Sequence, residues 1–207
     1  LGLRVEVRQT ADDARDSAIV DLDQRELAAQ VSWQRSRRLA VQSGVRWRRL
    51  HYGRPLFAMH PDSGVVARHR DQRDRAREVS LGLQLYAAML AQAGYSFTDN
   101  GSNSLGYAYR AHRVQLTVAR HLLCGVDGHA WFTAQVRDYT DKLGAAADSL
   151  SGEQDEYEQA LLALGVERQL SPRYSLSCQY RWGRNGSTAV AGSYRKRVLS
   201  FAVDMAL

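Results

Sequence analysis

The chain of 207 residues lacks any apolar run of the roughly 18 residues that a membrane-spanning helix needs. This absence excludes a helical membrane protein. It does not exclude a β-barrel, because only alternate residues of a barrel strand face lipid. The mean hydropathy of −0.43 is compatible with a soluble protein or with a barrel that has a polar interior. The length predicts a single domain.

Cysteine is scarce, with Cys124 and Cys178 as the two examples. Cys124 falls in a predicted short turn and Cys178 on the apolar row of a different predicted strand, so we expect no disulfide. The sequence has neither C-x-x-C nor H-x-x-x-H spacing, and no phosphate-binding loop or nucleophile elbow. We therefore expect no metal and no cofactor.

Lysine is also rare, and almost all of the 28 basic residues are arginine, against 22 acidic residues and a net charge of +6. One interpretation is a codon bias toward arginine and alanine. The other is attraction to polyanions such as lipopolysaccharide phosphates, acidic polysaccharide or nucleic acid. No nucleic-acid-binding motif is present, so we expect no nucleic-acid partner.

Strict alternation of apolar and polar residues dominates the stretch from Val79 to Val118. Successive side chains of a strand point to opposite faces, so this alternation predicts strands with one apolar face. The apolar positions are Val79, Leu81, Leu83 and Leu85, then Ala91, Ala93, Tyr95 and Phe97, then Val114, Leu116 and Val118.

The same pattern predicts about ten strands along the chain, joined by connections that alternate between short and long. Short turns are expected at Arg35–Arg38, Ala87–Leu90, Leu123–Gly128 and Leu170–Arg173, and long loops at Thr10–Gln24, Leu50–Arg75, Asp99–His112, Thr140–Glu158 and Gly183–Arg195. The sequence thus predicts an all-β fold: an antiparallel transmembrane β-barrel with short periplasmic turns and long extracellular loops. Its expected location is the outer membrane of a Gram-negative bacterium.

A helical alternative has to be weighed, because DQRELAAQVSWQ, LYAAMLAQA and SGEQDEYEQALLALGVERQL contain good helix formers. Ser151 and Gln154 also resemble a capping box, and these segments would suit a soluble α+β domain. The placement of aromatic residues favours the barrel, since they are expected near the two ends of the strands, as in the interfacial girdles of a barrel. The predicted girdle residues are Trp33, Trp47, Tyr95, Phe97, Phe132, Tyr180 and Trp182.

No export signal precedes the first predicted strand, because the alternation is already in phase at Leu1. A barrel must cross the inner membrane before assembly. We therefore expect residues 1–207 to form a single barrel domain, and the numbering to begin either after processing or inside a longer chain. In the second case the domain is the C-terminal part of that chain, and further strands or a periplasmic domain precede Leu1.

The polar positions of the predicted strands form an inward-facing row, because a charge that faces hydrocarbon near the midplane costs about 2–4 kcal/mol. This predicted lumen lining consists of Arg4, Glu6, Arg8, Gln30, Arg46, Arg48, Gln84, Arg113, Gln115, Gln135, Arg137, Glu167, Gln179 and Arg181. Such a row either fills a narrow lumen with Arg–Glu and Gln networks or lines a passage for anionic cargo.

The segments LSPRYSLSCQYRW, TDNGSNSLGYAYRAHRVQLTVARHL and SYRKRVLSFAVDMAL resemble the hairpins of Gram-negative outer-membrane β-barrels. The entry at Tyr107–Val114, repeated around Tyr194–Val198, is similar to the barrels of surface lipoprotein assembly modifiers and exopolysaccharide-export proteins. The resemblance implies partners: outer-membrane lipid and lipopolysaccharide, and other envelope proteins of an export or surface complex. One departure is Leu207, since such barrels usually end in Phe or Trp.

Catalysis is not expected. Asp99, His112 and Asp138 could meet at the extracellular rim as in outer-membrane proteases of the omptin type, but their spacing does not require it. Two functions stay open: a conduit, porin-like or for export of an anionic polymer or protein, and a non-conducting anchor or adhesin that displays its loops. We favour the conduit, because an inward arginine row suits anionic cargo.

Overall fold

The computed structural model describes residues 2–12, 22–60, 64–105, 107–140, 156–187 and 194–205. These residues form ten strands and one short 3-10 turn. The strands are β1 (Gly2–Asp12), β2 (Leu22–Ser36), β3 (Leu39–His60), β4 (Gly64–Tyr86), β5 (Leu90–Ser102), β6 (Tyr109–His121), β7 (Val126–Tyr139), β8 (Glu156–Ser171), β9 (Tyr174–Ser187) and β10 (Tyr194–Met205), with the turn η1 at Leu123–Gly125.

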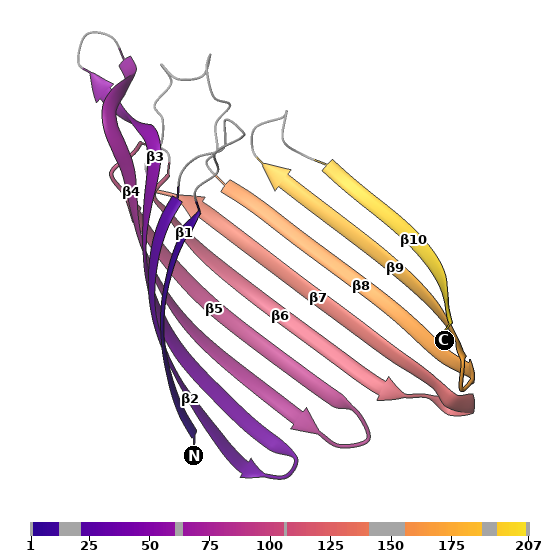
Figure 1. Cartoon of the computed structure of the whole chain (residues 1–207). Coiled ribbons are helices and arrows are strands. Elements are labelled where there is room, and N and C mark those ends of the chain that lie inside the picture. The colour runs from indigo at the N-terminus through magenta and orange to yellow at the C-terminus, as the bar shows by residue number, and fades with distance from the viewer. Residues whose placement is uncertain are drawn as a thin grey trace.

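All ten strands belong to one antiparallel sheet in which each strand pairs with its neighbour in sequence. Figure 1 shows that this sheet is curved along its strand order, because β1 to β4 are seen nearly edge-on while β6 to β10 are seen face-on. Among the described residues, hydrogen-bonded pairing continues from β1 to β10, and no strand pairing joins β1 to β10. The predicted all-β antiparallel fold is therefore confirmed.

The two faces of the sheet differ in polarity, because directly opposed residues keep their side chains on the same face. One row of directly opposed residues joins Trp33, Val41, Leu83, Ala93, Leu116, Phe132, Leu162 and Trp182 on the apolar face. A second row joins Arg4, Gln30, Gly44, Ser80, Ser96, Arg113, Gln135, Gln159 and Asn185 on the polar face.

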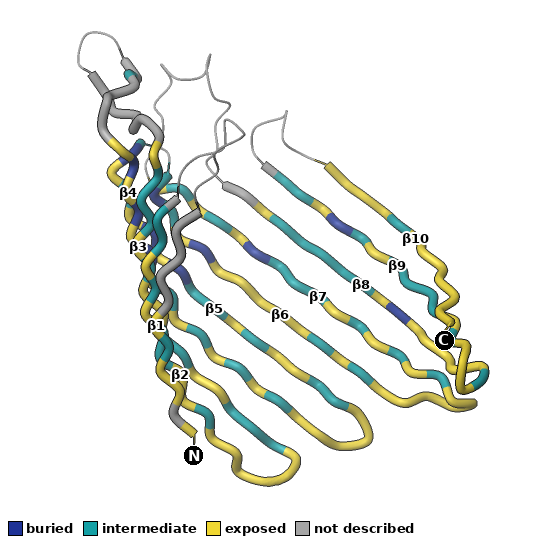
Figure 2. The backbone as a smooth tube through the Cα atoms, in the orientation of Figure 1, coloured by how far each residue is buried: buried dark blue, intermediate teal, exposed yellow. Residues whose placement is uncertain are grey.

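The apolar face is exposed over most of its area, and Val79, Leu81 and Phe201 keep 56%, 57% and 70% of their surface accessible. By contrast, the buried hydrophobic residues in the described chain are three alanines, Ala76, Ala108 and Ala111. Figure 2 shows how few residues of the strands are buried. An apolar surface of this extent needs a nonpolar surrounding, because monomeric soluble proteins rarely expose such patches.

The helical alternative is wrong for the residues that the structure describes. DQRELAAQVSWQ lies in β2, LYAAMLAQA spans the β4–β5 turn, and the described part of SGEQDEYEQALLALGVERQL lies in β8. Tertiary pairing overrides their helix propensity. In the described part of the chain, no helix is long and apolar enough to cross a membrane.

The predicted long loop Leu50–Arg75 is also wrong. β3 continues to His60 and β4 starts at Gly64, so both strands extend well past the apolar rows. Pro55 is tolerated because the β3–β4 register shifts between Tyr52 and Leu56. The predicted loops Asp99–His112 and Gly183–Arg195 are shorter than expected for the same reason: β5 and β9 continue to Ser102 and Ser187.

Candidate functional site

The polar face carries the predicted lumen residues. Direct pairing and alternation place the following on that face: Arg4, Glu6, Gln30, Arg46, Arg48, Gln84, Arg113, Gln115, Gln135, Arg137, Glu167, Gln179 and Arg181. Arg8 pairs with Glu26 through the backbone, and its side chain lies outside the described residues. That these residues line a lumen stays a prediction.

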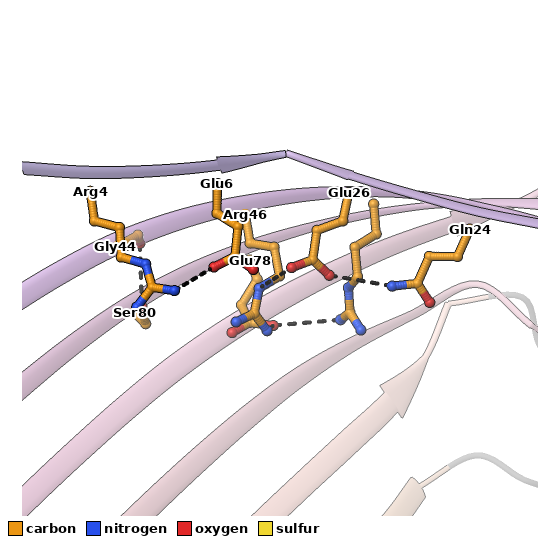
Figure 3. A network of polar contacts seen from close by, with 9 residues as sticks. Arg4, Glu6, Gln24, Glu26, Gly44, Arg46, Glu78 and Ser80 are labelled. Atoms are coloured by element: carbon orange, nitrogen blue, oxygen red, sulfur yellow. Dashed lines mark hydrogen bonds and ion pairs between the residues drawn. The ribbon is translucent and has the colours of Figure 1, made fainter. Parts of the chain in front are cut away.

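A network of ion pairs covers the polar face of β1 to β4. Arg46 lies between Glu26 at 3.4 Å and Glu78 at 3.6 Å, and Arg48 contacts Glu78 at 3.5 Å. Arg4 pairs with Glu6 at 3.1 Å on β1. Figure 3 shows these side chains pointing toward one another on one side of the sheet. The arginine charges of this half are therefore offset by carboxylates.

The polar face of β6 to β9 is different, because two of its arginines bind amide groups. Arg113 donates to Gln135 Oε1 from Nε at 2.9 Å and from Nη2 at 2.6 Å. Arg181 Nε donates to Gln179 Oε1 at 2.9 Å. A glutamine satisfies a donor without cancelling the guanidinium charge. This half of the face thus keeps positive charge available to an anion.

A hollow of about 500 Å³ lies on the polar face of β2 to β7. Its polar lining includes Gln30, Gln42, Arg46, Glu78, Gln84, Gln92, Arg113, Gln115 and Thr117. Gly82 and Gly94 oppose each other in its floor, and a Cβ at Gly82 would lie 3.7 Å from the Cβ of Gln42. The two glycines keep the floor of the hollow free of side chains.

Several residues of this face were not among the predicted ones. Glu26 and Glu78 neutralise Arg46, and Trp131 lines the hollow from β7. The Arg137 guanidinium lies 4.5 Å from the ring centroid of Tyr109, and its Nη1 donates to Tyr139 Oη at 3.3 Å. Parity along each strand would have placed these residues on the polar face. It could not have shown which strand-to-strand neighbours they meet.

The polar face is most enclosed where β4 and β5 extend past the apolar rows. Asp74 is 5% exposed, and its carboxylate accepts hydrogen bonds from Gln72 Nε2 at 3.1 Å and from Ser102 Oγ at 2.6 Å. The backbone N–H of Ser104 in turn donates to Ser102 Oγ at 3.1 Å. Neutral donors therefore hold a buried carboxylate against the chain that follows β5.

All seven predicted girdle aromatics lie on the apolar face. Their levels differ from the prediction in part. Trp33 is near the short-turn end of β2, but Phe132, Tyr180 and Trp182 lie near the middle of their strands. These three aromatic residues therefore do not lie near the strand ends, where girdle residues were expected. Strands that are tilted and staggered change the height of a residue in a way that sequence position alone does not show.

The residues considered for a hydrolase lie on the apolar face, not on the polar one. His112 Nδ1 contacts Tyr95 Oη at 2.7 Å, and Asp99 pairs with Arg110 at 3.5 Å. Arg110 directly opposes Asp138. Among the described residues, these three therefore form no histidine–carboxylate pair. Such pairs occur elsewhere: His51 with Asp71 at 2.9 Å on the apolar face, and His121 with Asp127 at 2.7 Å on the polar face.

No protein-family model matches the chain, and no curated protein matches its sequence. Similar solved structures do exist. The chain resembles OmpT, an outer membrane protein of Vibrio cholerae, in its in-vitro folded trimer form, with a TM-score of 0.58 and 10% identity over 97% of this chain and 62% of that one. A loop L8 deletion mutant of OmpT gives a TM-score of 0.54 with 12% identity over 97% of this chain and 61% of that one.

The siderophore receptor PirA from Pseudomonas aeruginosa gives a TM-score of 0.59 and 14% identity, over 99% of this chain and 34% of that one. The chain thus spans less than two thirds of each of these proteins. All of them are outer-membrane proteins of Gram-negative bacteria, in agreement with the predicted location. The curved antiparallel sheet with one apolar and one polar face therefore resembles part of the sheet of these Gram-negative outer-membrane β-barrels.

Proposed function

We propose that this chain forms part of the wall of an outer-membrane conduit, and that anionic cargo passes along the polar face of its sheet. The observation that carries the proposal is the pairing of Arg113 and Arg181 with glutamines instead of carboxylates. Arg113 also lines the hollow between β2 and β7. A partly enclosed surface of low dielectric constant focuses such unneutralised charge and raises the local concentration of anions.

The composition of the hollow supports passage over tight binding. Its lining contains five glutamines, three serines and three glycines, so it offers many weak hydrogen-bond donors and acceptors. Conduction requires sites that hold a solute weakly enough to release it. The further expectation that the sheet closes into a barrel around this face belongs to the same proposal.

The test is planar-bilayer conductance of the natural full-length protein with Arg113→Gln and Arg46→Gln. Arg113→Gln removes a charge that no described carboxylate offsets, and we expect anion selectivity to fall severalfold. Arg46→Gln leaves Glu26 and Glu78 without their shared partner, so selectivity should shift further, toward cations. Glu26→Gln is the matched control: it removes a negative charge instead of a positive one, and it should therefore increase anion selectivity.

Equal selectivity in all three variants would contradict the proposal. A silent bilayer would favour the alternative function, a non-conducting anchor that displays loops. The specific observation in favour of the anchor is the ion-pair network of β1 to β4, since mutually satisfied Arg and Glu side chains also fill a narrow lumen. In that case, binding of the protein to cells or envelope partners should depend on the loops and not on Arg113.

A further inference from the structure

Five arginines gather on the apolar face of β2 to β4, at the end opposite the short turns. Arg49 on β3 directly opposes Arg25 on β2 and Arg75 on β4. Arg73 and Arg77 lie two positions to either side of Arg75, so they share its face. We call Arg25, Arg49, Arg73, Arg75 and Arg77 the outer arginine cluster. All five side chains are exposed.

Like charges directly opposed on one sheet face are destabilising. On neighbouring strands, the charges at this level of the apolar face are offset: Arg110 pairs with Asp99 at 3.5 Å and Arg184 with Glu158 at 3.7 Å. In the cluster, Arg25 has a contact of 3.9 Å to Asp23. Arg77 directly opposes Asp99 on β5. Among the described residues, Arg49, Arg73 and Arg75 have no carboxylate within ion-pair distance. An external anion would remove their mutual repulsion.

The surface beside the cluster is apolar. Trp47 is 45% exposed and directly opposes Arg77 across β3 and β4. Val45 and Val79 oppose each other next along the same two strands, toward the short turns. The part of β4 that carries the cluster alternates between buried and exposed residues, and the arginines are the exposed ones. A molecule bound here would meet cations at one end and an apolar surface at the other.

There is also free space at the cluster. Gly101 on β5 directly opposes Arg75, and a Cβ at Gly101 would have no heavy atom within 4 Å. No side chain therefore covers Arg75 from the position of Gly101.

We propose that the outer arginine cluster binds the phosphate groups of a lipid in the surrounding membrane, a bisphosphorylated glycolipid of the lipid A class, whose acyl chains lie along Trp47, Val45 and Val79. Guanidinium groups match phosphate oxygens with paired hydrogen bonds, and two opposed arginines suit a headgroup that carries more than one phosphate. The apolar surface beside the cluster favours a lipid over a free anion. This proposal does not depend on conduction.

The test uses the natural full-length protein in detergent micelles and measures bound lipid by native mass spectrometry. The probes are bisphosphorylated lipid A, the same lipid without phosphates, and inorganic phosphate. The test variant is Arg49→Gln/Arg75→Gln, which we expect to weaken lipid A binding about tenfold or more, because charge-assisted hydrogen bonds to phosphate are lost. Gly101→Glu, which places a carboxylate opposite Arg75, should also weaken binding severalfold while every arginine remains.

The matched control is Arg120→Gln/Arg168→Gln. It removes two arginines from the apolar face at the short-turn end, where Arg120 opposes Gly128 and Arg168 opposes Val126. Binding should stay within twofold. Unchanged binding in Arg49→Gln/Arg75→Gln, an equal loss in the control, or equal binding of the phosphate-free lipid would each overturn the proposal. Displacement of lipid A by millimolar inorganic phosphate would identify a free-anion site instead. Heat-dependent migration in gels confirms that each variant is folded.

Discussion

At the scale of single residues, Asp74 shows which contacts stabilise the polar face in the part of β4 that extends beyond the apolar residues. Its carboxylate is buried and accepts hydrogen bonds from Gln72 and Ser102. Asp74→Ala leaves both donors without this acceptor, which should lower the free energy of unfolding by about 1–3 kcal/mol. The measurement is urea unfolding in lipid vesicles. Asp99→Ala is the control, because the Asp99 side chain is 51% exposed, and a loss as large as that of Asp74→Ala would contradict the argument.

Gly82 is the residue that tests whether the hollow matters for passage. An added methyl group fits, because a Cβ would lie at the ordinary contact distance of 3.7 Å from Gln42. Gly82→Ala should therefore leave single-channel conductance nearly unchanged. Gly82→Trp fills much of a hollow of about 500 Å³ and should reduce conductance at least severalfold. Equal conductance in the two variants would mean that solutes do not cross this part of the face.

At the scale of elements, alternation predicts which face a side chain takes and much less about where a strand ends. The β4 residues from Val79 to Leu85 were identifiable as a strand because apolar and polar residues alternate. Beyond Val79, toward Asp71, charged and polar residues occupy both sides of β4. Arg73, Arg75 and Arg77 lie on the apolar side and Gln72, Asp74 and Glu78 on the polar side, so the alternation of apolar and polar residues disappears. This explains why the long β3–β4 hairpin was predicted as a loop.

The pairing of strands was also beyond prediction. The alternation within β3 and within β6 predicts that Arg46 and Arg113 lie on the polar face. Only the register between strands determines that Arg46 meets Glu26 and Glu78 while Arg113 meets Gln135. That difference is the basis of the proposed selectivity, and it arises from residues far apart in sequence.

The orientation of the hairpins gives an element-scale prediction. His60 at the end of β3 and Gly64 at the start of β4 lie at the end of their strands opposite the short turns Ala87–Met89 and Pro172–Arg173. Short turns face the periplasm in outer-membrane barrels. An epitope tag inserted after Asp62 should be labelled on intact cells, whereas a tag inserted after Ala88 should be labelled only after permeabilisation. The reverse result would invert the topology.

At the scale of the whole molecule, the apolar rows form a continuous band, bounded at the end away from the short turns by a charged residue on each strand from β2 to β10. These residues are Arg25, Arg49, Arg77, Asp99, Arg110, Asp138, Glu158, Arg184 and Arg197. On β4 the band runs from Val79 to Leu85, which is about 20 Å along the strand. With the strand tilt of about 35–45° that is usual in barrels, this length corresponds to a height of about 15 Å, against about 25 Å for the lipid-facing band of known barrels.

The band therefore predicts how the cost of a charge changes with depth. Leu83→Arg places a guanidinium near the middle of the band and should destabilise the protein by about 2–4 kcal/mol in vesicles. Val79→Arg lies at the edge, next to Arg77, where the expected cost is about 0–1 kcal/mol. Gln84→Arg introduces the same charge on the polar face and should cost little, because water reaches that face. Equal losses for Leu83→Arg and Gln84→Arg would show that both faces meet water, and the apolar face would then not be the surface in contact with lipid.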